Sequence, residues 1–243
     1  EVLAVGDKDF QKKCLGKMNS LTTEGRTILF VSHNMLSIQM LCPKSILLDS
    51  GELKLFDDTQ KVLRLYHSHN IQKGFSGEKS WSDLKNAPGD SKVRLKSVSV
   101  SSNNSITNRP VINKDIDLNI KYVVQEPGIK WAVSIHIFNS MGVLIFSTGN
   151  LRSVSLKPDP WYDKKYSIGY YDTRMTIPKF LVNNGDYNVK LYIYDIVTRE
   201  KPIVEDNIIS FTVEDTPDMR QEYSGDWQGI IRPRIMWNTE KIK

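Results

Sequence analysis

The sequence predicts a mainly β protein, in which an antiparallel β-sandwich of immunoglobulin-like or jelly-roll type follows a smaller α/β segment. From residue 92 onward, apolar and polar side chains alternate with a period of two, and turn signals separate the short stretches. Before residue 67, helical spacing of apolar residues alternates with short continuous apolar runs. All five tryptophans lie at or beyond Trp81, and this shift in aromatic content supports two modules.

The first part of the chain is expected to alternate between helix and strand. A helix is predicted over residues 8–21, because its spacing gathers four apolar residues on one face: Phe10, Cys14, Leu15 and Met18. The stretch "EGRTILFVSH", residues 24–33, predicts a turn and then a buried apolar strand that ends at His33. Residues 34–42 predict a second helix.

A hairpin and a final helix complete this part. Residues 45–57 are expected to form two strands joined by a turn at Asp49, Ser50 and Gly51, and residues 59–68 have the spacing of a capped helix. The next stretch is rich in Ser, Gly, Asn and Lys, which is typical of a linker. The expected organisation is therefore an α/β segment over residues 1–66, a linker over 67–91 and a sandwich over 92–243.

The sandwich is expected to contain seven or eight short strands with no helix between them. In "NNGDYNV", Tyr187 enters a strand after a Gly-Asp turn and is arranged like a tyrosine corner. Trp131 is in phase with Val133 and Ile135 and is expected in the core. The candidate strands are residues 93–100, 115–124, 130–138, 142–149, 166–177, 186–196, 206–213 and 228–237.

Composition argues against several classes of function. Hydrophobic residues make up 40% of the chain and charged residues 25%, which is typical of a soluble globular protein. No apolar run has the length of a membrane span and no signal-peptide pattern is present, so we expect a cytoplasmic protein. The two cysteines, Cys14 and Cys42, have no metal-ligand spacing, and we expect neither a disulfide nor a metal site. The net charge of +5 is spread without a basic stripe, so we expect no nucleic-acid binding.

Three stretches in the first module carry a more specific resemblance. The segments "EVLAVGDKDFQKKC", "TILFVSHNM" and "SILLDSGELKLFDD" resemble the last third of an ABC-transporter nucleotide-binding domain. They are most similar to the ATP-binding subunits of polysaccharide (O-antigen) exporters of the Wzt type. The resemblance implies that Glu1 polarises the water that attacks ATP and that His33 contacts the terminal phosphate. It also implies that Gly6 and Asp7 belong to the D-loop, which faces the opposing subunit.

The chain departs from that pattern in two ways. It contains no G-x-x-x-x-G-K-[ST] phosphate loop and no Ser-Gly-Gly signature motif. The resemblance therefore implies a carboxyl-terminal fragment of such a domain, and we expect residues 1–66 to be inactive as an ATPase alone. ATP and Mg²⁺ would be cofactors of the intact parent subunit, with none held by this fragment. Separated from the rest of its sheet, the fragment should expose apolar surface.

The second module resembles the carboxyl-terminal sandwich of the same subunits, through "GDYNVKLYIYD" and "GDWQGIIRPRIMW". The resemblance implies export of a lipid-linked polysaccharide, with the sandwich binding the glycan, commonly at its modified non-reducing end. It also implies a homodimer, a membrane-spanning transporter partner and a peripheral position on the inner face of the bacterial inner membrane. A purely structural sandwich, which dimerises without touching sugar, is the alternative.

Alternation within three strands identifies a candidate glycan-binding face. If these strands are neighbours, one exposed face combines Asn119, Lys121, Ser134, His136, Lys190, Tyr192 and Tyr194. Such a mixture suits a sugar, because aromatic rings stack on its C–H side and polar groups meet its hydroxyls. An ordinary solvated face would have the same composition. Trp161 and Tyr162, on a predicted loop, are secondary candidates for ligand or partner contact.

The last apolar segment, residues 229–237, contains Pro233, which suits an edge strand. It could close the sandwich or exchange with a partner. We favour exchange, because the implied homodimer supplies a partner.

Overall fold

The computed structural model consists of two compact units, residues 1–66 and 67–243, and each is treated separately. Glu1, Gly6, Asp7 and His33 lie outside the residues that the structure describes, as does the helix expected over 8–21, so these expectations stay predictions. The described residues are 27–31, 38–39, 41–72, 77–217, 225, 227 and 229–242.

The first unit contains the predicted hairpin. Strands β1 (Lys44–Asp49) and β2 (Glu52–Asp58) pair antiparallel. The two residues that join them, Ser50 and Gly51, have φ angles of 54° and 81°, as a type I′ turn requires. Helix α3 (Thr59–Gln72) follows at once and continues past the expected end at residue 68. Its first residue is held at the hairpin, because the Thr59 hydroxyl hydrogen-bonds the Ser45 hydroxyl at 2.7 Å.

The prediction of a buried strand over residues 24–33 is wrong for residues 27–31, the part that the structure describes. Residues 27–31 form no strand, and Leu29 and Val31 are 84% and 87% exposed. A buried strand needs hydrogen-bonding neighbours on both sides, and none of the described strands pairs with this stretch. The hairpin also exposes apolar side chains, so the first unit does expose apolar surface as expected: Ile46, Leu48, Leu53 and Phe56.

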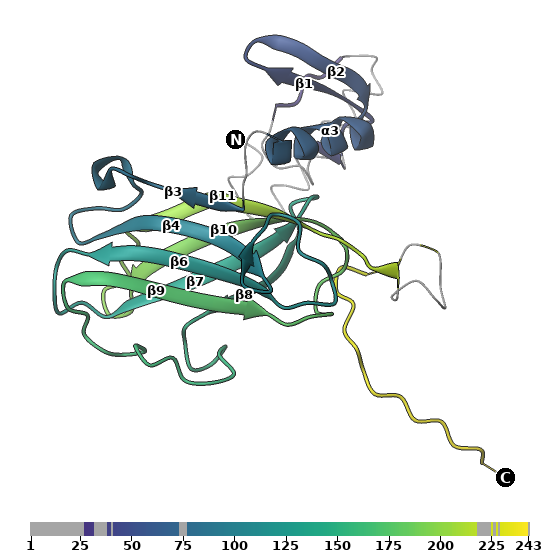
Figure 1. Ribbon diagram of the computed structural model, residues 1–243. Coiled ribbons are helices and arrows are strands. Elements are labelled where there is room, and N and C mark those ends of the chain that lie inside the picture. The colour runs from purple at the N-terminus through teal and green to yellow at the C-terminus, as the bar shows by residue number, and fades with distance from the viewer. Residues whose placement is uncertain are drawn as a thin grey trace, which may run out of the picture. The chain divides into compact units, whose positions relative to one another are not determined.

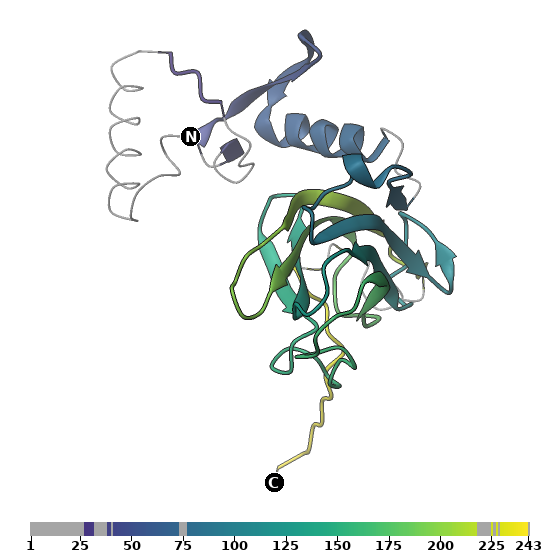
Figure 2. The same ribbon diagram turned by 90° about the vertical axis from the view of Figure 1, so that its left-hand side faces the viewer.

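The second unit is an antiparallel β-sandwich, which confirms the predicted fold class (Figures 1 and 2). One sheet has the order β11-β10-β7-β8, and the other has the order β3-β4-β6-β9 with β5 beside β4. The strands are β3 (Glu78–Ser80), β4 (Val93–Ser102), β5 (Ser105–Ile106), β6 (Ile116–Val124), β7 (Trp131–Asn139), β8 (Leu144–Gly149), β9 (Gly169–Ile177), β10 (Gly185–Asp195) and β11 (Ile203–Val213).

The core lies between the two sheets and follows the predicted alternation. Trp131, Val133 and Ile135 of β7 are all buried, as are the alternate residues of β6 and β10. The predicted tyrosine corner is also present, because the Tyr187 hydroxyl donates to the Asn183 carbonyl at 2.8 Å. Burial raises the pKa of Tyr187 to about 12, so this hydroxyl stays a donor at neutral pH.

Two stretches differ from the sequence-based expectation. The linker expected over 67–91 begins within α3, and from β3 onward it belongs to the sandwich, because β3 pairs with β4 and the Lys96 ammonium bonds the Trp81 carbonyl at 2.9 Å. A short 3-10 helix, Leu84–Asn86, follows. The strand expected over 228–237 is reduced to one bridge between Ile231 and Val182. Pro233 has no N–H with which to extend the pairing.

Candidate functional site

The structure divides the seven residues expected on one glycan-binding face between the two sheets. Strand β6, which carries Asn119 and Lys121, pairs with β4 and β9 and is not a neighbour of β7 or β10. Because the outer faces of a sandwich point in opposite directions, the expectation of a single face is wrong for these two residues. The other five lie together on adjacent strands: Ser134, His136, Lys190, Tyr192 and Tyr194.

These five residues and Phe138 form a surface that we call the β7–β10 face. Strand register places Lys190 opposite His136, and Tyr192 opposite Ser134. All six side chains are half-buried, whereas the residues between them on β10 are buried in the core. The face therefore follows from the period of two in each strand and from the pairing of the two strands.

Aromatic rings cover the middle of this face. The His136 and Tyr192 rings are tilted by 50° with centroids 4.8 Å apart, and the His136 and Phe138 centroids are 6.4 Å apart. Both distances fall within or near the range of favourable ring pairs, so each ring limits the movement of the next. The result is a partly exposed aromatic surface with few free rotations to lose on binding.

Two lysines approach the same tyrosine ring. The Lys190 and Lys201 ammonium nitrogens lie 5.3 Å and 5.6 Å from the Tyr192 centroid. Lys190 also pairs with Asp206 on β11 at 2.7 Å, and this hydrogen bond is the main cause of its raised pKa. Among the described residues, no carboxylate pairs with Lys201, so the face carries excess positive charge.

The charge of the two lysines affects the pKa of His136. Partial burial lowers the pKa of its imidazole below the usual 6.5, and the nearby Lys190 and Lys201 lower it further. At pH 7 the ring is therefore neutral, with one nitrogen that donates and one that accepts a hydrogen bond. The Ser134 hydroxyl donates to the Thr148 carbonyl at 2.9 Å and keeps its acceptor capacity toward the outside.

Sequence reasoning missed Lys201. It lies in the loop between β10 and β11, and no alternation applies to a loop. The signal available in the sequence was its position a few residues after two strand tyrosines, in "YIYDIVTREK". Only the fold brings its ammonium over the ring of Tyr192.

On the outer face of the other sheet, polar side chains hydrogen-bond one another. The Asn119 amide donates to the Ser101 hydroxyl at 3.0 Å and accepts from the Arg174 guanidinium at 3.0 Å. Lys121 is exposed and lies opposite Asp172 in the strand register. We call this surface the β6–β9 face; it consists of Ser101, Asn119, Lys121, Asp172 and Arg174.

The secondary candidates, Trp161 and Tyr162, lie in the loop between β8 and β9, as expected. The Trp161 ring packs on tyrosines of the sandwich, and the Arg152 guanidinium lies 5.1 Å from the centre of the Tyr162 ring. In the parts of the chain that the structure describes, no three His, Cys, Asp or Glu side chains form a metal-binding cluster. No helix found there is long and apolar enough to cross a membrane.

Comparison with known proteins finds sequence relatives for about a quarter of the chain. The chain is 39% identical over 66 residues to the teichoic acids export ATP-binding protein TagH of Bacillus anthracis, and the match covers 27% of this chain and 12% of that protein. It is 45% identical over 67 residues to the ABC transporter protein AbcA of Aeromonas salmonicida, covering 28% and 22%. It is 38% identical over 66 residues to the O-antigen export system ATP-binding protein RfbB of Klebsiella pneumoniae, covering 27% of each.

These relatives confirm the resemblance to ATP-binding proteins of ABC exporters. The chain spans only 12 to 30% of the length of the curated relatives with the highest similarity. No family model matches the chain. Among solved structures, the crystal structure of the C-terminal domain of Wzt aligns with 67% of this chain and 89% of that chain, with a TM-score of 0.47 and 17% identity.

Proposed function

We propose that this chain is part of the ATP-binding subunit of an ABC exporter for a cell-surface polysaccharide, and that its sandwich binds the exported glycan. The relatives support the first half, because their names describe export of teichoic acids and O-antigen. The observation that carries the second half is the Tyr192 ring, which has His136 beside it and two lysines over it.

The β7–β10 face offers the chemistry that a sugar requires. The rings of Tyr192 and Tyr194 supply apolar faces for the C–H side of a pyranose, while His136 and Ser134 supply hydrogen-bonding atoms for its hydroxyls. Lys201 adds a cation that a carboxylate or phosphate substituent would attract. On the β6–β9 face, by contrast, the amide and guanidinium groups already bond one another.

ATP hydrolysis belongs to the intact subunit in this proposal. Glu1 and His33 would act on ATP there, with Mg²⁺ and with the D-loop residues Gly6 and Asp7 facing a second subunit. This chain has no phosphate loop, so its own residues do not suffice to hold ATP. The partner would be a membrane-spanning transporter subunit, and the assembly would lie on the inner face of the membrane.

The carboxyl-terminal segment supports a homodimer as the assembly of the sandwich. This segment, residues 229–242, is anchored near its beginning, because Arg232 pairs with Asp215 at 3.1 Å and the Arg234 guanidinium lies 3.7 Å from the centre of the Phe180 ring. Beyond it the described residues extend away from the sandwich without strand pairing (Figure 1), and Met236 and Trp237 are 95% and 89% exposed. A second copy, with its own segment in return, would cover these side chains.

Two measurements test the proposal. Titration of the whole chain with its host's polysaccharide should give saturable binding, and the double variant His136→Ala, Tyr192→Ala should weaken it by about tenfold or more. Lys121→Ala, a matched surface change on the β6–β9 face, should leave affinity unchanged. Retention of full affinity by the double variant would support the purely structural alternative. Light scattering should report a dimer, and removal of residues 235–243 should yield monomers.

A further inference from the structure

The tryptophan in the loop between β8 and β9 is held on a base of tyrosines. The Trp161 ring lies 5.0 Å from the centre of Tyr166 and 5.0 Å from that of Tyr171, edge-on to the latter at 87°. The side chain is still 40% exposed. A large aromatic ring that is supported from one side and open on the other is unusual for a loop, because loop side chains normally move freely.

The base is fixed to the sandwich. Tyr166 is buried, and its backbone N–H and C=O bond Ile129 and Gly128 at 2.9 Å and 2.8 Å. Tyr171 stacks on Tyr122 of β6 with centroids 5.8 Å apart, and its hydroxyl donates to the Ser167 carbonyl at 2.9 Å. Trp161 is therefore held before any ligand arrives, and little side-chain entropy remains to be lost on binding.

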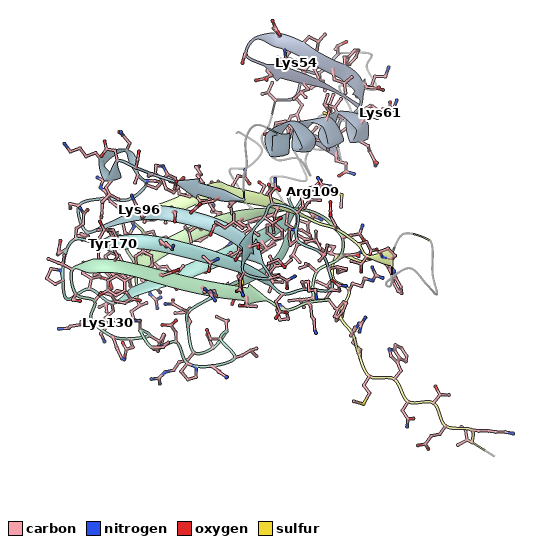
Figure 3. All side chains as sticks on the ribbon, viewed as in Figure 1. Lys54, Lys61, Lys96, Arg109, Lys130 and Tyr170 are labelled. Carbon is pink, nitrogen blue, oxygen red and sulfur yellow. The ribbon has the colours of Figure 1, made fainter. Side chains whose placement is uncertain are left out.

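Charged groups surround the exposed ring. The backbone N–H of Trp161 donates to the Asp159 carboxylate at 2.8 Å, and the Lys164 ammonium lies 5.9 Å from the centre of the Trp161 ring. Asp163, two residues after Trp161 in the same loop, pairs with Lys130 at 2.6 Å. Figure 3 labels Lys130, which lies at one end of the sandwich. A flat apolar surface with fixed donors and acceptors at its edge matches the two sides of a pyranose ring.

We infer that Trp161 is a stacking platform for a sugar ring and forms a second glycan subsite, separate from the β7–β10 face. The inference rests on the proposed function for the identity of the polymer. Lys130 connects the two surfaces along the chain: it holds Asp163 of the loop and immediately precedes β7, whose Ala132 lies opposite Tyr194. If one polysaccharide chain contacts both subsites, each contact raises the effective concentration of the other.

The test follows the indole N–H signals of the whole chain, labelled with nitrogen-15 at tryptophan, during titration with the host polysaccharide and with simple methyl glycosides. Trp161→Phe assigns the signal. The Trp161 signal should shift saturably, while that of Trp237 should not. Trp161→Ala should weaken polysaccharide binding about three- to tenfold, Trp161→Phe should retain most of it, and Tyr170→Ala, an exposed ring on the outward side of β9, should leave it unchanged. The unfolding midpoint of each variant separates lost binding from lost folding.

The outcomes separate this inference from the proposed function. A stationary Trp161 signal, with polysaccharide binding still sensitive to Tyr192→Ala, would overturn the platform and leave the β7–β10 face intact. A stationary signal with no binding of any glycan would overturn both. A shift produced by raising the protein concentration alone would identify a protein contact, in which the exposed Leu156 of the same loop would be expected to take part, and would also overturn the platform.

Discussion

The two outer faces of the sandwich have similar sequence patterns and different chemistry. Both alternate polar residues with a buried set, and both contain lysine and hydrogen-bonding side chains. On the β6–β9 face, Asn119 bonds Ser101 and Arg174, so the polar groups bond one another. On the β7–β10 face, aromatic rings occupy the centre, and Lys201 has no carboxylate partner among the described residues.

This difference teaches that exposure alone does not mark a binding surface. A side chain that has already found its partners gains little from a ligand, because each new hydrogen bond replaces an existing one. A ring held by its neighbours, with water on its open side, gains apolar contact at small entropic cost. The contrast predicts that substitution of Asn119, which bonds two neighbours, changes stability more than binding, whereas substitution of the aromatic residues on the β7–β10 face changes binding more than stability.

The largest expected effect on folding comes from Asn119→Ala. Removing the amide leaves the Ser101 hydroxyl and the Arg174 guanidinium without a shared partner, and the free energy of unfolding should fall by about 1 kcal/mol. Urea denaturation measures this change, with Lys121→Ala as the exposed control on the same strand. Glycan affinity should stay at the level of the unsubstituted chain; a parallel loss of affinity would assign binding to this face as well.

A smaller effect is expected from His136→Gln, as a dependence on pH. The pKa of His136 is lowered in the folded state, so the unfolded chain takes up the proton more readily. Its contribution to stability is present above pH 6.5 and declines as the pH falls below that value toward the folded-state pKa. Lys190, Lys201 and Asp206 are the charged groups near the ring.

Unfolding free energies of His136→Gln and of the unsubstituted chain, compared at pH 8 and pH 5, isolate this term, because all other titrating groups are shared. The unsubstituted chain should lose more stability over that interval, by less than about 1 kcal/mol. Equal losses in the two proteins would mean that neither burial nor the lysines lower the pKa of His136 in the folded state.

The smallest effect is expected from Asp206→Asn. Its side chain is 71% exposed, so loss of the ion pair with Lys190 should cost less than about 0.5 kcal/mol. The released ammonium should increase affinity for an acidic glycan and leave that for a neutral glycan unchanged, as measured by titration at low salt. Asp172→Asn, opposite Lys121 on the β6–β9 face, should change neither affinity.

The sequence predicted what depends on neighbours along the chain. Period-two alternation identified the buried residues of β6, β7 and β10, and the Gly-Asp turn before Tyr187 identified the tyrosine corner. Strand pairing depends on residues that are far apart in the sequence. Alternation alone therefore could not show that Asn119 and His136 lie in different sheets. The same limit explains why the tyrosines beneath Trp161 were not foreseen, since they meet it only through the packing of the sandwich.

Two other differences concern apolar segments that were expected to form strands. Residues 229–237 are apolar enough for a strand, but Pro233 interrupts the donors that a ladder needs. Residues 27–31 are apolar enough for a buried strand, but burial requires neighbours, and none of the described strands provides them. Apolar composition in both cases indicates what a segment would bury if it were paired.

Asn183 determines how far the carboxyl-terminal segment can extend. Its side chain bonds the carbonyls of Trp227 and Gly229 at 3.1 Å and 3.0 Å, and its own carbonyl accepts the tyrosine-corner bond. These bonds fix the beginning of the carboxyl-terminal segment next to the first residue of β10. The distance to which the segment can extend is therefore set by the residues after Arg234. The described residues 235–242 span about 26 Å when fully extended. Trp237 is the third residue after Arg234, so its backbone can lie at most about 10 Å from Arg234, and a partner surface for its ring must lie about one sheet-to-sheet spacing from that anchor.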